Sequence, residues 1–125
     1  MPMKHISGAS LPHKPADPKN FVLPATMQRL LGREDDESVR LYRVSFESGA
    51  RTNWHTHNDT QLLFGLSGRC IVMDRAGDEL VLDPGDVVVI EAGLEHWHGA
   101  ASDGPGAHLA INVGTETSWL DSSAG

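Results

Sequence analysis

Alternating apolar and polar positions dominate the chain from residue 38 onward and predict an all-β domain. In residues 39–47 the alternation places Tyr42, Val44 and Phe46 on one face of a strand, because side chains two positions apart point to the same side. Residues 87–90 are a run of valine and isoleucine, which favour strands. Further strands are expected at residues 60–66, 69–74, 78–82, 94–100 and 107–113. Glycine-containing turns separate these segments, and turns recurring every 8–12 residues or so are typical of a β-sandwich or barrel.

The beginning of the chain lacks this alternation and predicts an irregular N-terminal arm. Prolines at positions 12, 15 and 18 favour extended chain over helix. Residues 24–31 could form one or two helical turns, but a segment this short is marginal as a helix, and a short strand is the alternative. The acidic run at residues 34–37 predicts a solvated loop. We therefore expect an arm at residues 1–37, a barrel at residues 38–120 and a frayed end at residues 121–125.

Composition narrows the class of protein. The 125 residues suit one domain, and 17 acidic against 10 basic side chains give a net charge of -7. This balance argues against nucleic acid or an anionic membrane as a partner, since both require a basic surface. A single cysteine, Cys70, excludes an internal disulfide and predicts a small core residue. The sequence has neither a membrane-length apolar run nor a secretory signal, so we expect a cytoplasmic protein.

Histidine spacing is the strongest chemical signal in the sequence. Four of the seven histidines form two His-x-His pairs, His55 with His57 and His96 with His98, on predicted strands. Each pair points to one face of its strand, so both pairs can converge inside a barrel. Buried imidazoles need a partner, and a divalent transition metal such as Mn, Fe, Ni or Zn is the simplest one. The pattern therefore predicts one metal site per chain.

Two stretches around these pairs resemble the conserved motifs of the cupin superfamily. Residues 49–68 match the first motif in spacing through Gly49, His55, His57, Gln61 and Gly68, with Gln61 in place of the family glutamate. Residues 85–100 match the second motif through Gly85, Gly93 and His96, with Glu91 and Ala100 in place of the family proline and asparagine. The resemblance implies a single-domain jelly-roll barrel. It also implies that the metal ligands are His55, His57, Gln61 and His96.

A narrower resemblance points toward an activity. Residues 51–57, 96–101 and 108–111, with Gln61, are similar to small bacterial cupins related to carboxymuconolactone-decarboxylase-associated proteins. That group includes the cupin-type hydroxynitrile lyases, which cleave cyanohydrins with manganese or iron. The resemblance implies that His98 and His108 are the catalytic histidines, and it favours Mn or Fe as the cofactor over Ni or Zn. It implies a small-molecule substrate and a homodimer.

The residues leave several functions open. In a lyase, one of His98 and His108 would take a hydroxyl proton and the other would protonate the leaving anion. His98 could instead be a further metal ligand or hold a ligand in place. Arg51 shares the parity of His55 and could bind a substrate carboxylate, or it could pair with an acid at a strand end. An Fe- or Mn-dependent dioxygenase and a non-catalytic ligand-binding cupin are the alternatives to a lyase.

Overall fold

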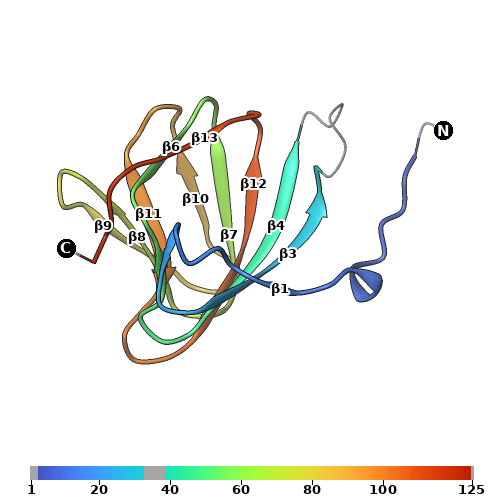
Figure 1. Cartoon of the computed structure of the whole chain (residues 1–125), viewed down its shortest axis with the longest axis horizontal. Helices are drawn as coiled ribbons and strands as arrows, with labels where there is room; N and C mark the ends of the chain where they lie inside the picture. The colour runs from blue at the N-terminus through green and yellow to red at the C-terminus, as the bar shows by residue number, and fades with distance from the viewer. Residues whose placement is uncertain (1–2, 33–38, 125) are drawn as a thin grey trace.

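The computed structural model describes residues 3–32 and 39–124 and consists almost entirely of strands (Figure 1). The first sheet has the order β1-β3-β4-β12-β7-β10, with bounds Lys14–Pro15, Ala25–Leu31, Arg40–Phe46, Gly106–Asn112, Gln61–Gly68 and Val87–Ile90. The second sheet joins β13, β6, β11, β5 and β2, with bounds Thr117–Trp119, His55–His57, His96–Ala100, Arg51–Thr52 and Phe21–Val22. It also contains β8, Cys70–Asp74, which pairs with β11, and β9, Glu79–Leu82, which pairs with β8. In the described ranges the only helical element is the 3-10 turn η1, Gly8–Ser10.

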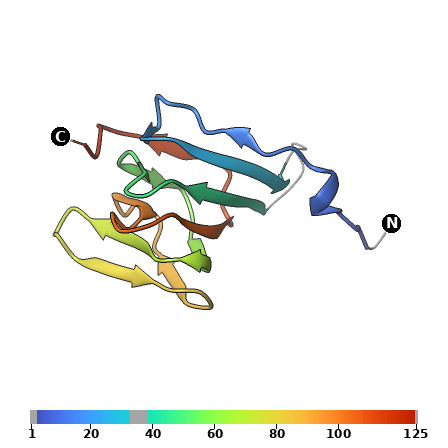
Figure 2. The same ribbon diagram turned by 90° about the horizontal axis from the view of Figure 1, so that it is seen from below.

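All strand pairs of both sheets are antiparallel, and the two sheets enclose the barrel interior (Figures 1 and 2). The prediction of an all-β jelly roll is confirmed. The turn after β9 shows how the sequence produces it: Asp86 donates its backbone N–H to the Asp83 carbonyl at 2.9 Å, and Gly85 has a φ of 89° that favours glycine. No described helix is long and apolar enough to cross a membrane.

The segment at residues 24–31 forms a strand, β3, and not a helical turn. β3 pairs with β4 along most of its length, so residues placed in the predicted arm belong to the first sheet. Its outer face is covered as well: Gln28 is buried and its side-chain amide donates to the carbonyls of Gly8 and Leu11. Pairing with β4 satisfies the backbone, which an isolated helix of this length does poorly. Of the rest of the N-terminal segment, β2 joins the second sheet beside β5 and β1 pairs with β3, and toward the N-terminus the chain leaves the body of the protein (Figure 2). The acidic run at residues 34–37 lies outside the described residues.

Apolar packing fills much of the interior. One cluster is made by Leu63, Cys70, Val72, Leu82, Val88, Ile90 and Ala110. A second cluster is made by Ala25, Val44, Phe46, Ala50 and Ala100. Cys70 is 1% exposed, which confirms that it is a core residue.

One glycine allows the close approach of two strands beside the histidines. Gly99 on β11 lies opposite Arg51 on β5, and a Cβ at Gly99 would lie 2.2 Å from the Ala50 carbonyl oxygen. The close contact brings Thr52 under β11, where its hydroxyl accepts the backbone N–H of His98 at 3.2 Å. The backbone that carries His98 is therefore held in place from a second strand.

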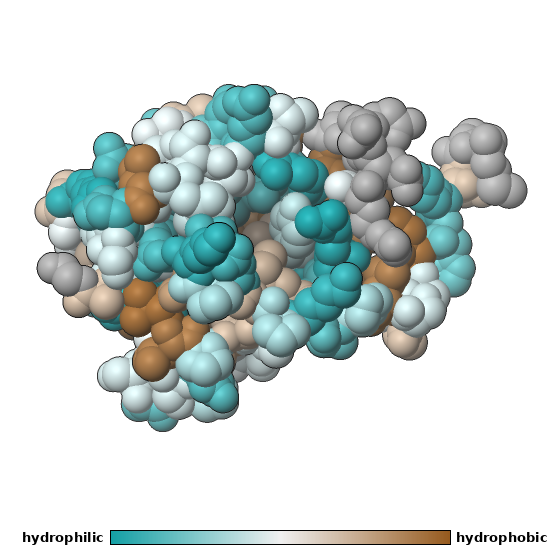
Figure 3. All heavy atoms as spheres, in the orientation of Figure 1, coloured by the Kyte–Doolittle hydropathy of each residue, from teal (hydrophilic) through white to brown (hydrophobic). Residues whose placement is uncertain are grey.

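Several apolar side chains on the edge strands are exposed, and they bear on the predicted homodimer. Leu80 and Val81 on β9 and Val87 and Val89 on β10 are exposed. Exposed apolar residues of this kind are found at subunit interfaces but do not by themselves define one. The face drawn in Figure 3 is largely hydrophilic, with hydrophobic residues in a few small patches. The homodimer stays a prediction.

Candidate metal centre and active site

Five histidines from three strands meet inside the barrel. His55 and His57 lie on β6, His96 and His98 on β11, and His108 on β12, and all five are buried. His96 lies opposite His55 in the β6–β11 pair, and their ring centres are 4.3 Å apart. The ring centres of His98 and His108 are 4.8 Å apart. The prediction that the two His-x-His pairs converge on the interior is confirmed.

Backbone carbonyls orient two of the imidazoles. The Nδ1 of His55 donates to the Asn53 carbonyl and the Nδ1 of His96 to the Leu94 carbonyl, each at 2.8 Å. A carbonyl oxygen only accepts, so Nδ1 carries the proton in both rings. The Nε2 atoms then present lone pairs, which is the tautomer that a metal ligand requires.

Gln61 on β7 contacts one of these lone pairs. Its Nε2 donates to Asn112 Oδ1 at 2.8 Å, which directs Gln61 Oε1 toward the histidines. Gln61 Oε1 lies 3.0 Å from His96 Nε2. With the His96 proton on Nδ1, two acceptors face each other in a buried site. A cation bound by both atoms would remove this conflict, so the donor set fits a metal ion.

Burial keeps the imidazoles neutral, as metal ligands must be. It lowers the pKa of His57 to about 4, with His96 and the positive charge of Arg40 acting in the same direction. It lowers the pKa of His55 well below its usual value of 6.5, with the neighbouring His96 as the next cause. The pKa of His96 is lowered by burial too. At neutral pH the site is therefore a cluster of uncharged nitrogen donors.

Two overlapping sets of residues could hold the metal. His55, His96 and His98 each offer a ligand atom, and these atoms lie within 4.8 Å of one another. The Nε2 of His57 is buried and has no hydrogen-bond partner in the described chain, while its Nδ1 lies 3.0 Å from Thr117 Oγ1. The ligand set His55, His57, Gln61 and His96 stays a prediction. The alternative in which His98 is a further ligand stays a prediction too.

His98 and His108 form a buried pair. His108 Nε2 lies 2.9 Å from His98 Nδ1, so one of these atoms donates to the other. The remaining nitrogens, His98 Nε2 and His108 Nδ1, have no hydrogen-bond partner within the described residues. His98 lines the cavity described below, whereas His108 is fully buried and packs against Phe46. His108 is therefore linked to the cavity through its hydrogen bond to His98. Burial lowers the pKa of His98 well below 6.5 and that of His108 to about 4.

The structure places Arg51 away from the histidines, so the prediction that it faces them is wrong. Its guanidinium donates to the Ser123 carbonyl at 2.8 Å and to the Ser123 hydroxyl at 3.2 Å, and it stacks 5.0 Å from the ring centre of Trp97. The strand is interrupted at Asn53 and Trp54, between β5 and β6. The interruption shifts the parity, and Thr52 faces inward in place of Arg51.

A cavity of about 260 Å³ opens onto the histidines. Its lining includes His55, His57, Gln61 and His98. Its apolar wall includes Phe21, Met27, Val44 and Trp119. Trp119 packs on His55, with ring centres 4.6 Å apart. The cavity thus combines imidazoles with aromatic surface and can accommodate a small organic molecule.

Two arginines line this cavity that were not assigned a role from the sequence. Arg40 lies on β4 and Arg29 on β3, both in the first sheet. A signal for Arg40 was present, because it shares the parity of Tyr42, Val44 and Phe46, which the alternation already placed on one face. Arg29 has no such signal, because the pattern of residues 24–31 leaves both a helical turn and a short strand open.

Fold and histidine cluster together define a jelly-roll protein with a buried site suited to a metal ion. Residues 42–113 match the family model described as "Cupin domain", so the chain belongs to the cupin family.

Comparison with known proteins adds particular relatives. The chain is 34% identical to an (R)-mandelonitrile lyase from Granulicella tundricola over 97% of its own length and 93% of the relative. A crystal structure of a cupin-like protein from Thermotoga maritima is 31% identical, covers 90% of this chain and 89% of its own, and has a TM-score of 0.83. A polyketide cyclase from Streptomyces resistomycificus has a TM-score of 0.72 over 97% of this chain and 87% of its own. At 14% identity the likeness to the cyclase is one of fold alone.

Proposed function

We propose that this protein is a metal-dependent lyase of the hydroxynitrile-lyase type, which cleaves a cyanohydrin into an aldehyde and hydrogen cyanide. The observation that carries the proposal is the buried His98–His108 pair beside the imidazole cluster, with His98 in the cavity wall. The 34% identity with an (R)-mandelonitrile lyase supports the reaction class. The aromatic side chains of the cavity suit an aryl-bearing substrate such as mandelonitrile.

The proposal includes one divalent transition metal per chain, with Mn or Fe favoured. Residues of the set His55, His57, Gln61 and His96 would hold it. When bound, such an ion supplies a Lewis acid that lowers the pKa of a substrate hydroxyl. Because the set contains no carboxylate, the ligands leave the positive charge of the ion uncompensated and favour an anionic oxygen in the site.

The His98–His108 pair supplies the proton transfers. When His98 Nδ1 donates to His108 Nε2, the unpartnered His98 Nε2 carries the lone pair that accepts the hydroxyl proton. The carbon–carbon bond then breaks, its electron pair leaves with cyanide, and the carbon–oxygen bond becomes a carbonyl. The proton held by the imidazole pair returns to cyanide, so atoms and charge balance. The contact between the rings stabilises the charge that His98 carries between these steps.

Mandelonitrile cleavage by the metal-loaded protein, followed as benzaldehyde release, tests this proposal. We expect His98→Ala to lower turnover by roughly 10²- to 10⁴-fold, the contribution typical of a general acid–base group, while the metal content is unchanged. His13→Ala is the matched control, because His13 is exposed and lies outside the cluster.

Other outcomes separate the alternatives. Loss of the metal on His98→Ala would make His98 a ligand. No benzaldehyde release by the fully metal-loaded wild-type protein would overturn the proposal. Substrate-dependent dioxygen uptake would point to the oxidoreductase.

A further inference from the structure

Arg40 lies level with the candidate ligand Gln61 across the strands of the first sheet. In the register of the sheet Arg40 lies opposite Asn112, and Asn112 lies opposite Gln61. Each of these three side chains lines the cavity. The guanidinium of Arg40 is therefore separated from Gln61 by one strand and belongs to the same cavity wall as the histidines.

Part of the Arg40 guanidinium has no partner among the described residues. Its Nε donates to the Gly114 carbonyl at 3.1 Å, but its Nη2 is buried and forms no hydrogen bond within the described chain. A buried donor without an acceptor is costly, and more so when it belongs to a charged group. Because Arg40 is part of the cavity lining, an acceptor carried by a ligand in the cavity would stabilise this guanidinium.

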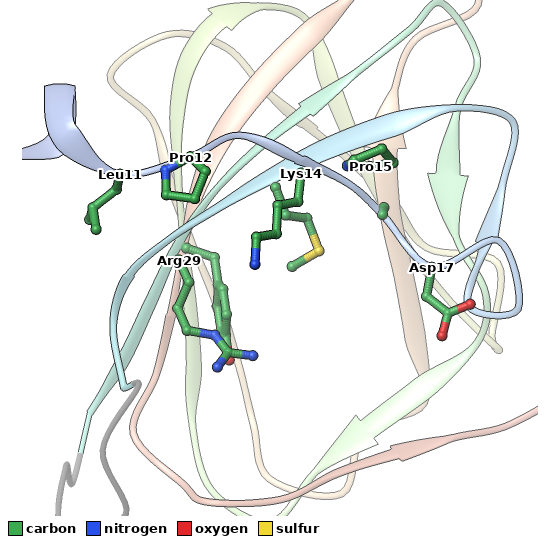
Figure 4. A pocket seen from close by; sticks show the side chains of 9 residues that line it. Leu11, Pro12, Lys14, Pro15, Asp17 and Arg29 are labelled. Atoms are coloured by element: carbon green, nitrogen blue, oxygen red, sulfur yellow. The ribbon is translucent and has the colours of Figure 1, made fainter.

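Arg29 adds a second positive charge to the same cavity. It also lines a neighbouring groove of about 290 Å³, into which the side chains of Lys14 and Arg29 point (Figure 4). The ion pairs observed among the described residues involve Arg69 and Arg75, not these cations. Asp17 is the only carboxylate in the described lining of either hollow. In a chain with a net charge of -7, this is a local concentration of positive charge.

We propose that the ligand of this cavity carries a carboxylate, which Arg40 binds while the other end of the ligand reaches the histidines. A guanidinium matches a carboxylate in shape and charge and can donate two parallel hydrogen bonds to it. Arg29 contributes a second positive charge at the same side of the cavity. With the proposed function, on which this substrate class rests, the substrate is a cyanohydrin that bears a carboxylate. Unsubstituted mandelonitrile would then be a poorer substrate.

Paired ligands that differ only in the carboxylate provide the binding test. The probes are 4-formylbenzoate and benzaldehyde, and their affinity for the metal-loaded protein is measured by calorimetry, without turnover. We expect the wild-type protein to bind 4-formylbenzoate more tightly. Arg40→Gln should weaken the binding of 4-formylbenzoate by roughly 10- to 100-fold, as expected for the loss of a hydrogen bond between charged groups. Benzaldehyde binding should change little.

Arg43→Gln is the matched control, because Arg43 is exposed and lies on the same strand three residues away. It removes one positive charge from β4 without changing the cavity wall, and we expect it to leave the affinity for 4-formylbenzoate within about twofold. Arg40→Lys retains the charge and guards against a folding defect in Arg40→Gln. It should bind 4-formylbenzoate with intermediate affinity. Equal affinity of the wild-type protein for both probes, or equal weakening by Arg40→Gln and Arg43→Gln, would overturn the inference.

Turnover of the two cyanohydrins separates this inference from the proposed function. If the protein binds 4-formylbenzoate through Arg40 but cleaves neither cyanohydrin, the carboxylate site stands and the lyase proposal fails. If it cleaves mandelonitrile and its 4-carboxy derivative with equal kcat/KM, and Arg40→Gln changes neither, the lyase stands and the carboxylate site fails.

Discussion

The first apolar cluster, which contains Leu63, and the histidine cluster with its neighbour Gln61 share strands β7 and β12 but are stabilised in different ways. β7 contributes Leu63 to the first and Gln61 to the second, and β12 contributes Ala110 to the first and His108 to the second. In the apolar cluster, burial is favourable by itself. In the histidine cluster, buried nitrogens of three imidazoles lack hydrogen-bond partners in the described chain, and each such group costs roughly 1–3 kcal/mol. The apolar cluster thus maintains the fold, whereas the histidine cluster lowers stability and is suited to chemistry.

Removing one histidine should distinguish the two regions most strongly. We expect His55→Ala to abolish metal binding, because the lone pair of His55 Nε2 is oriented by its Nδ1 contact with the Asn53 carbonyl. The measurement is elemental analysis after loading with Mn or Fe, together with the shift of Tm on adding metal. His5→Ala, in the exposed N-terminal segment, is the control. Retention of a full metal equivalent in His55→Ala would show that the metal lies elsewhere.

Truncation of a side chain in the apolar cluster should lower stability and leave metal binding unchanged. Leu63 is completely buried in the apolar cluster, and Leu63→Ala removes packed methyl groups while every histidine is retained. We expect the free energy of unfolding to fall by about 2–5 kcal/mol, with metal content and the pH dependence of stability unchanged. Urea unfolding of the metal-free protein measures it. A loss of metal in this variant would mean that the two regions are more strongly coupled than the structure indicates.

Lowering the pH should destabilise the metal-free protein through the histidine region. Burial lowers the pKa of His57 and His108 to about 4, against an ordinary value of 6.5 in the unfolded chain. Below pH 6.5 the unfolded chain binds protons that the folded protein does not, so stability is complete above about pH 6.5 and falls toward pH 4. The slope is at most about 1.4 kcal/mol per pH unit for each histidine. Urea unfolding at several pH values measures this slope, and a flat profile would contradict the prediction.

The smallest expected effect is on metal affinity, through the residue that orients the Gln61 side chain. Asn112 holds the amide of Gln61 in the orientation that directs Oε1 at His96. Asn112→Ala frees this amide, and we expect metal affinity to fall by roughly 10- to 100-fold, as for other residues that orient metal ligands. Competition with a chelator measures the affinity, and Thr26→Ala, at an exposed position of β3, is the control. Unchanged affinity would mean that Gln61 is not a ligand.

Local pattern was sufficient to predict much of the interior. The alternation in residues 39–47 placed Tyr42, Val44 and Phe46 on one face, and the two His-x-His pairs brought four imidazoles together. These predictions succeeded because the parity of a regular strand depends only on the residues within it. The same rule failed for Arg51, because the interruption at Asn53 and Trp54 is not visible as a change of pattern.

Residue pattern and family resemblance were enough to predict an all-β cupin barrel, the histidines that enter it and a site that could bind a metal ion. The folded structure was needed to show that residues 25–31 join the first sheet, that His108 lies behind His98 and that Arg40 and Arg29 line the cavity with the histidines. The physical reason is the same in each case. Each feature depends on how one strand is placed against another, and that placement is set by the packing of the whole barrel and not by the residues within either strand.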